Sequence, residues 1–148
     1  YLEWNQTGWK DHDQPDDVSR ETITQLTAYF HGNLRCFDLP LMPAGASQSR
    51  RRWLDVMSTI PFGVTISYAE FATAAGYPKA ARAAGSACAT NPIPIIYPCH
   101  RVLYKNGQLG NYSGDSHLPP THQDNLQRKA FLISHETRQL NGHPYRKA

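Results

Sequence analysis

A stretch rich in proline and glycine, residues 40–45, most constrains how this chain can fold. It holds two prolines and one glycine in six residues. Both residue types interrupt regular structure, since proline lacks a backbone donor and glycine lacks a preferred conformation. At 148 residues the chain suits one or two small domains with buried cores. The stretch therefore predicts a boundary between a small unit, residues 1–42, and a larger one, residues 43–148.

The smaller unit is predicted to be a small α/β domain. Residues 1–17 lack periodicity and predict a short strand and a loop. Apolar residues recur at helical spacing from Ser19 to Phe30, and Gly32 is suited to end that helix. A second short strand is expected over residues 35–39. Because the sequence starts with Tyr rather than Met, we expect this unit to be truncated.

The larger unit is predicted to be mainly helical, so that the whole chain falls in the α+β class. A helix is expected over residues 47–59, and its apolar face comprises Trp53, Val56, Met57 and Ile60. A last helix is expected from Gln123 to about His135, capped by Thr121 and Asp124, with Leu126, Ala130 and Ile133 on a shared face. Between these helices, the dipeptide Asn106-Gly107 predicts a hairpin with a type I′ turn.

Two short helices in the middle of this unit have the order of a helix-turn-helix. Ser67 and Glu70 have capping-box spacing and predict a helix that ends at Ala75. After a glycine turn, Pro78 suits the first turn of a second helix that runs to about Thr90. Such a pair is typical of DNA-binding proteins, but plain helix packing is the alternative.

The tetrapeptide Pro98-Cys-His-Arg101 carries the clearest chemistry. A cysteine thiol has a pKa of about 8.5 and becomes a good nucleophile only when a base or cation favours its thiolate. His100 and Arg101 adjoin Cys99 in sequence. Consecutive residues of a strand point to opposite faces, so adjacency alone also fits a buried thiol beside a surface histidine.

The residues around this motif remove that ambiguity. From Ile60 the chain continues IPFGVTISYAEFATAAGYPKAARAAGSACATNPIPIIYPCHRVLYKNGQLGNYSG. This run resembles the O6-alkylguanine-DNA alkyltransferases over residues 47–114, and the likeness resumes over residues 126–136. Related alkyltransferase-like proteins carry tryptophan at the position of Cys99. The resemblance therefore points to the active branch, which transfers an alkyl group from O6-alkylguanine in double-stranded DNA to its own cysteine in a single turnover.

The resemblance also implies how DNA is engaged. Duplex DNA hides the alkyl group in the base stack, so the damaged nucleotide must be flipped out at a cost of a few kcal/mol. By resemblance, Arg82 replaces the extruded base, and Tyr68 crowds the 3′ phosphate and then bonds guanine N3. The helix that carries Arg82 enters the minor groove, where small residues permit close approach. Its remaining DNA-binding positions are Ala81, Ala83, Ala84 and Ser86.

A set of catalytic and pocket residues follows from the same resemblance. Cys99 attacks the alkyl carbon, His100 acts as general base through a water, Glu136 orients His100, and Asn91 organises the active-site turn. The pocket for the alkylated guanine is lined by Pro94, Val102, Tyr112, Ser113 and Gly114. Ordinary surface or core roles would be preferred for Tyr68 and Arg82 without the resemblance.

Composition limits the partners. The net charge is +3, and a set of basic residues falls in the second half, where a polyanion would dock, although a solvated basic face is the alternative. Three cysteines without Cys-x-x-Cys spacing, and no long apolar run, favour a soluble protein of a reducing compartment. We therefore expect cytoplasmic location in a bacterium or nuclear location in a eukaryote, a monomer, and neither metal nor cofactor nor membrane partner.

Two departures from the family pattern concern the segment after the pocket. Asp115 stands where the family usually has a second glycine, and residues 116–125 make a longer, proline-containing connection to the last helix. This connection either borders the pocket mouth and tunes the size of the alkyl group or is a tolerated surface insertion.

Two other functions remain as alternatives. One is a lesion-binding protein that marks alkylguanine without transfer, which the presence of Cys99 disfavours. The other is a Cys-His hydrolase of esters or amides, which would turn over repeatedly and need no DNA.

Overall fold

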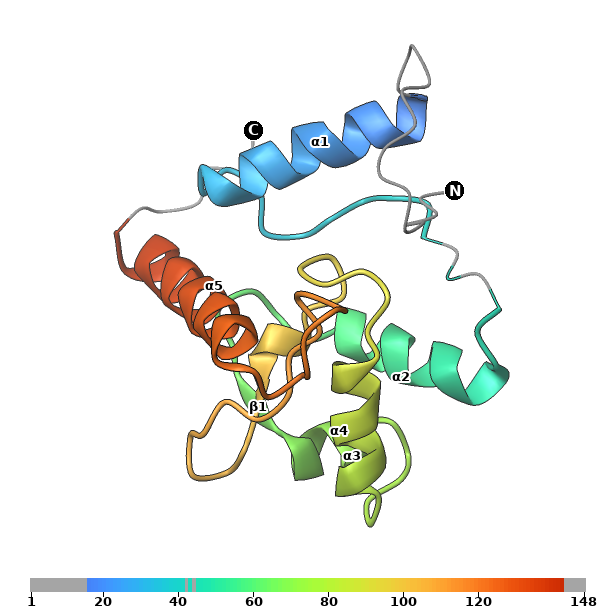
Figure 1. Ribbon diagram of the computed structural model, residues 1–148. Coiled ribbons are helices and arrows are strands. Elements are labelled where there is room, and N and C mark those ends of the chain that lie inside the picture. The colour runs from blue at the N-terminus through green and yellow to red at the C-terminus, as the bar shows by residue number, and fades with distance from the viewer. Residues whose placement is uncertain (1–15, 42, 44, 143–148) are drawn as a thin grey trace. The chain divides into compact units, whose positions relative to one another are not determined.

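The computed structural model describes residues 16–41, 43 and 45–142. The chain divides into two compact units, residues 1–42 with 145–148 and residues 43–144. Figure 1 labels the five α-helices and the strand β1. No helix among the described residues is both long and apolar enough to cross a membrane.

The described part of the first unit is built around one helix, α1 (Asp17–Phe30). The Asp16 carboxylate caps it by accepting a hydrogen bond from the Ser19 amide at 2.7 Å. Gln25 on the buried face of α1 donates to the Asp38 carbonyl and accepts from the Asp38 amide, both at 2.8 Å. Residues 35–39 are therefore held by a side chain and form no strand. The prediction of a strand here was wrong, since a strand needs a backbone partner. The strand predicted within residues 1–17 lies almost wholly outside the described residues.

Three helices begin the second unit: α2 (Gln48–Ser58), α3 (Tyr68–Ala74) and α4 (Ala81–Ala89). Ser47 caps α2, as the predicted helix over residues 47–59 requires. The capping box of α3 is present, because the Ser67 hydroxyl accepts from the Glu70 amide at 3.2 Å and the Glu70 carboxylate accepts from the Ser67 amide at 2.7 Å. The predictions of these two helices are confirmed.

The helix α4 starts later than the sequence predicted. Pro78 lies in a turn that the hydrogen bond from the Ala80 amide to the Tyr77 carbonyl closes at 2.9 Å. Proline favours the second position of such a turn, so it serves the connection instead of the first helical turn. Gly76 has φ +86°, a conformation that favours glycine. This turn brings α3 and α4 against each other.

Two arginines of α2 bind the ends of the following helices. Arg52 donates to the carbonyl of Ala75, which caps the end of α3, and Arg50 donates to the carbonyl of Thr90, which caps the end of α4. The last carbonyls of a helix lack intrahelical donors and carry partial negative charge, so cations stabilise them. These arginines therefore have a structural role in addition to any effect of their charge on DNA.

The remaining elements bring the tetrapeptide Pro98–Arg101 next to the last helix. The strands β1 (Ile66–Ser67) and β2 (Val102–Leu103) pair in parallel, and the 3-10 helix η1 (Cys99–Arg101) precedes β2 directly. The helix α5 (Gln123–Gly142) packs against η1 and continues beyond the predicted end at His135. The mixed α+β class is confirmed for the described chain.

A turn forms after β2 as predicted, and the Tyr104 amide donates to the Gln108 carbonyl at 2.9 Å across it, but the predicted type I′ turn and second strand were wrong. The Gly107 amide donates to the Tyr104 carbonyl at 2.9 Å, but only Gly107 of the dipeptide has positive φ. A type I′ turn requires positive φ at both central residues. Residues 108–111 form no strand, and β2 uses its pairing with β1 instead.

Candidate active site

Cys99 lies at the start of η1 and is fully buried. The turn before it is organised by Asn91, whose side chain donates to the Tyr97 carbonyl at 2.7 Å and accepts from the Ile93 amide at 3.1 Å. Ile95, inside this turn, has φ +76°, which is strained for a β-branched residue. The side chain of Asn91 thus bridges a strained turn whose end presents the thiol.

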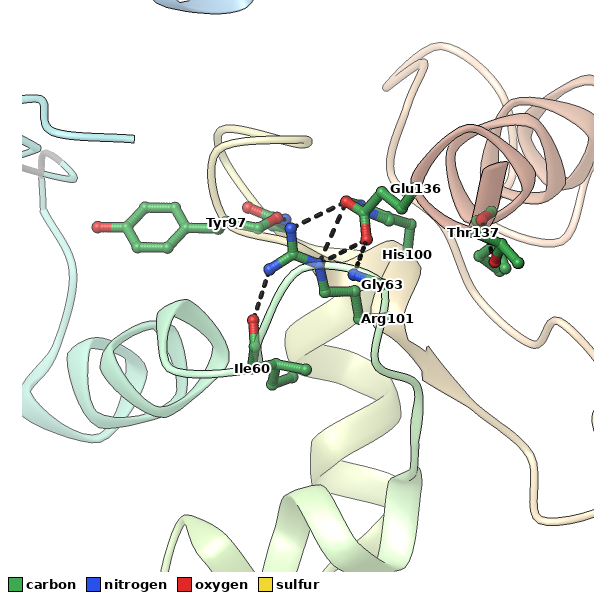
Figure 2. Close-up of polar contacts among 9 residues, drawn as sticks. Ile60, Gly63, Tyr97, His100, Arg101, Glu136 and Thr137 are labelled. Atoms are coloured by element: carbon green, nitrogen blue, oxygen red, sulfur yellow. Dashed lines mark hydrogen bonds and ion pairs between the residues drawn. The ribbon is translucent and has the colours of Figure 1, made fainter. Parts of the chain in front are cut away.

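Glu136 of α5 binds the side chains of His100 and Arg101, the two residues that follow Cys99 in sequence (Figure 2). His100 donates through Nε2 to Glu136 Oε1 at 2.7 Å, and Arg101 donates through Nη2 to the same oxygen at 2.8 Å and through Nε to Oε2 at 3.0 Å. The Gly63 amide also donates to Oε2, at 2.8 Å. Arg101 reaches the Ile60 carbonyl with Nη1. Hydrogen bonds from this many donors hold the carboxylate in place and favour its ionised form.

The bond to Glu136 also sets the tautomer of His100. Because Nε2 carries the proton that Glu136 accepts, neutral His100 has its lone pair on Nδ1. That atom is buried and has no protein hydrogen-bond partner among the described residues. The imidazole is therefore arranged to accept a proton at Nδ1.

Burial and charge set the protonation of these groups. Burial raises the pKa of the Cys99 thiol, although hydrogen bonding with Asn91, the charge of Lys129 and hydrogen bonding with Ser113 oppose it. Burial lowers the pKa of His100 below its ordinary value, against the opposing effect of Glu136. Burial acts to raise the pKa of Glu136 as well, but hydrogen bonds from His100 and Arg101 outweigh it and lower that pKa to about 2. At neutral pH the site therefore holds a thiol, a neutral imidazole and a carboxylate.

Lys129 of α5 belongs to this region and was not predicted. It is fully buried, and its ammonium donates to the carbonyls of Val102 at 2.6 Å and Asn111 at 2.9 Å, and to that of Leu109. Burial lowers the pKa of Lys129 to about 8. The ammonium thus joins β2 to the segment that leads to Tyr112.

The buried face of α5 is not the shared apolar face predicted from the sequence. Leu126, Ala130 and Ile133 are only partly buried, whereas the buried positions are Asn125, Lys129, Leu132, His135 and Glu136. Four of these, at positions 125, 129, 132 and 136, follow helical spacing. Three of these four residues, Asn125, Lys129 and Glu136, are polar, so a search for apolar periodicity could not find this buried face.

Tyr68, the first residue of α3, is buried rather than exposed to solvent. Its phenol oxygen accepts a hydrogen bond from the Asn111 amide at 2.8 Å, which leaves its own proton available for donation. Burial raises the pKa of Tyr68, so the phenol stays protonated. Gly110 permits this contact, since a Cβ there would lie 2.3 Å from the phenol oxygen.

The helix α4 exposes most of the residues predicted to meet DNA. Arg82 is exposed, as are Ala81, Ala83 and Ser86. Ala84 is fully buried, so its assignment to the DNA-binding face was wrong. The reason is helical periodicity, because Ala84 and Cys88, four residues apart, form the inner face of α4.

The residues predicted to line the pocket differ in burial. Val102 and Tyr112 are buried, Pro94 and Ser113 are partly exposed, and Gly114 is exposed. Ser113 donates through its hydroxyl to the Asn91 carbonyl at 3.1 Å. The structure thus brings Ser113 to the turn that carries Cys99, while Gly114 is exposed to solvent.

Among the described residues, no group of three or more histidine, cysteine and acidic side chains is placed to hold a metal ion. Of the three cysteines, Cys88 and Cys99 are buried and Cys36 is exposed, and all three are free.

Fold and site together define a class of proteins in which a buried cysteine, backed by a histidine–glutamate pair, adjoins two short helices joined by a tight turn. The model of the 6-O-methylguanine DNA methyltransferase DNA-binding domain matches residues 48–138. The chain belongs to this family.

Curated relatives agree with this assignment. The methylated-DNA–protein-cysteine methyltransferase of Methanosarcina acetivorans is 45% identical over 98 residues, which cover 66% of this chain and 62% of that protein. The constitutive enzyme of Bacillus subtilis is 35% identical over 136 residues, which cover 92% of this chain and 76% of that protein. The chain thus spans less than two thirds of the first relative and about three quarters of the second.

Solved structures show the same fold. Mycobacterium tuberculosis OGT in complex with DNA superposes with a TM-score of 0.71 at 39% identity, covering 81% of this chain and 68% of that one. The O6-methylguanine methyltransferase of the same organism gives a TM-score of 0.72 at 34% identity, covering 95% and 79%.

Proposed function

We propose that this protein repairs DNA by transferring an alkyl group from O6-alkylguanine irreversibly to Cys99. The observation that carries the proposal is the arrangement of Cys99 and His100 with the buried carboxylate of Glu136, in a chain of this family. The relatives' names and the DNA complex of a family member support the same reaction. Residues 43–148 form the DNA-binding and transfer domain in this proposal, and residues 1–42 a separate N-terminal domain.

The transfer is a displacement at carbon. His100 takes the thiol proton at Nδ1 through a bridging water, and Glu136 stabilises the resulting imidazolium. The Cys99 sulfur then forms a bond to the alkyl carbon as the bond from that carbon to guanine O6 breaks. The electron pair of the broken bond stays with the base, and the proton removed from the thiol ends on the released guanine. Because the product is a thioether, the protein works once.

The resting protonation states fit this role for His100. A thiol whose pKa is raised needs a base, and an imidazole whose pKa is lowered is neutral and ready to accept a proton. Glu136, with its pKa lowered to about 2, remains charged at every pH where the protein would act. The buried ion pair with Arg101 keeps that charge compensated between reactions.

The leaving base needs stabilisation as negative charge develops on it. Tyr68 can donate its phenol proton to guanine N3, because its oxygen already accepts from the Asn111 amide. In this proposal the Ser113 amide lies near guanine O6 and the carbonyls of Cys99 and Val102 accept from the guanine amino group. Asn91 keeps the turn that presents Cys99 in place.

DNA is bound in this proposal as a monomer on the face that α4 exposes. Arg82 inserts into the base stack, while the small side chains of Ala81 and Ala83 allow the helix to approach the minor groove. Phosphate contacts would supply most of the affinity, so binding should weaken as salt rises.

Mass spectrometry tests the proposal. The protein is incubated with duplex DNA that contains one O6-methylguanine and is then digested. We expect one methyl group per protein, located on Cys99, and no second turnover. Cys99→Ser should lose transfer but retain DNA binding. A label on Cys36 or Cys88, or repeated turnover, would overturn the proposal, and binding without any transfer would favour the lesion-binding alternative.

A further inference from the structure

The connection between Gly114 and α5 is closed by one buried side chain. Asn125, which is fully buried, accepts a hydrogen bond from the Asp115 amide at 2.8 Å. Its Nδ2 donates to the carbonyls of Asp115 and Pro119, both at 3.2 Å. Arg128 donates to Asn125 Oδ1 at 3.0 Å. The amide of Asn125 thus fastens both ends of residues 115–119 to the first turn of α5.

The same connection supports residues 112–114, here termed the pocket loop. The Tyr112 amide donates to the Pro120 carbonyl at 3.0 Å, so the loop and the connection share a backbone hydrogen bond. Gly114 lies against the Tyr112 ring so closely that a Cβ on Gly114 would meet a ring carbon at 2.4 Å. The pocket loop is therefore held on its outer side by residues that Asn125 anchors.

The inner side of the pocket loop meets the reactive residue. The polar groups of Ser113 act to lower the pKa of the Cys99 thiol, and the Ser113 hydroxyl donates to the Asn91 carbonyl at 3.1 Å. A shift of the pocket loop would move the hydrogen-bonding groups beside the sulfur. A path of direct contacts thus leads from Asn125 through Asp115 and the pocket loop to Cys99.

We propose that Asn125 is a positioning residue that holds the pocket loop close to Cys99 and thereby favours small alkyl groups over large ones. The inference rests on the proposed function. Moving a pocket loop that is hydrogen-bonded on both sides costs free energy, since each displaced buried polar group would lose its partner. On this inference a methyl group is accommodated with the pocket loop in place, whereas the larger benzyl group is accommodated only when the pocket loop moves. The departures at Asp115 and residues 116–125 therefore determine specificity.

The test compares Asn125→Ala with the wild-type protein. Gln127→Ala is the matched control, because Gln127 is exposed on the same turn of α5. Single-turnover rate constants are measured at saturating duplex DNA that carries either O6-methylguanine or O6-benzylguanine in the same sequence. DNA affinity is measured separately by fluorescence anisotropy, and thermal unfolding checks that each variant is folded.

Asn125→Ala is expected to slow methyl transfer about tenfold, because a small misplacement of reacting groups is costly. Benzyl transfer should slow less or accelerate, so that the benzyl-to-methyl ratio rises at least severalfold while DNA affinity stays the same. A merely structural role would lower both rates equally, and an unchanged ratio in the folded variant would overturn the inference while leaving the proposed function intact.

A second variant covers the case in which Asn125→Ala does not fold. Residues 115–119 are replaced by two glycines in a protein that retains Asn125, which frees the pocket loop without leaving a cavity in α5. The ratio should rise here as well, and an unchanged ratio would again overturn the inference. If the wild-type protein accepts neither alkyl group, the proposed function itself is wrong.

Discussion

His100 and Glu136 are joined by a 2.7 Å hydrogen bond between Nε2 and Oε1, although one lies on η1 and the other on α5. The same Glu136 carboxylate also accepts hydrogen bonds from the Arg101 guanidinium and the Gly63 amide. One carboxylate thus connects the base of the proposed reaction to the packing of the domain, and its removal should affect both.

Glu136→Gln is expected to lower both stability and activity. It leaves the Arg101 cation buried without a charged partner, which should cost about 3 kcal/mol in the free energy of unfolding. Without a carboxylate to stabilise the imidazolium, the transfer rate should fall about 100-fold. Urea unfolding and single-turnover kinetics measure the two effects. Thr137→Ala, at the exposed next position, is the control, and equal behaviour of the two variants would contradict the role of Glu136.

Acid should destabilise the domain through Glu136. Its pKa is lowered from 4.5 to about 2 in the folded protein. A lowered carboxyl pKa contributes stability that is complete above the unfolded value and is lost as pH falls toward the folded value. The free energy of unfolding of the wild-type protein should therefore decrease between about pH 4.5 and pH 2. Glu136→Gln should show a smaller decrease, and identical slopes would refute the assignment.

The transfer rate should depend on pH through His100. Because burial lowers the pKa of His100, the imidazole remains neutral below its ordinary value of 6.5. The rate of methyl transfer should thus stay high as pH falls through 6.5 and decline only at lower pH, where protonation removes the base. Stopped-flow measurements at saturating DNA give this profile. A midpoint above 6.5 would contradict the buried, neutral imidazole.

Gly110→Ala should be more harmful than Gly107→Ala. Both glycines have positive φ, +72° and +83°, so alanine is strained at either position by about 1 kcal/mol. A Cβ at Gly107 meets open space, whereas one at Gly110 would lie 2.3 Å from the Tyr68 phenol oxygen. We expect Gly110→Ala to cost about 2 kcal/mol more and to slow transfer. Equal free energies of unfolding for the two variants would show that Tyr68 yields easily.

Arg82→Ala should impair repair in a way that depends on the substrate. If Arg82 fills the place of the extruded base, its loss matters most where extrusion is costly. The transfer rate should therefore fall more on fully paired duplex DNA than on duplex DNA whose O6-methylguanine is mispaired. Lys79→Ala, which removes an exposed cation just before α4, controls for charge. Similar losses on both substrates would argue against insertion.

Local features of the fold were predictable because neighbouring residues determine them. The Ser67–Glu70 capping box acts within one helical turn, and it starts α3 where the sequence predicted. The strand over residues 35–39 and the hairpin after β2 were not predictable in the same way. A strand forms only where another backbone segment is available to pair with it. The Gln25 side chain binds the backbone of Asp38, and β2 pairs with β1 rather than with the residues that follow it.

The sequence by itself determined the chemistry of the site, since the run from Ile60 to Gly114 identified the family and singled out Cys99, His100 and Asn91. Only the tertiary structure decided how these groups are joined. Consecutive residues of a strand would diverge, but the 3-10 turn at Cys99 lets His100 and Arg101 reach Glu136 together. The burial of Lys129 and Asn125 was not predicted, because apolar periodicity cannot show that distant backbone carbonyls and amides need buried partners.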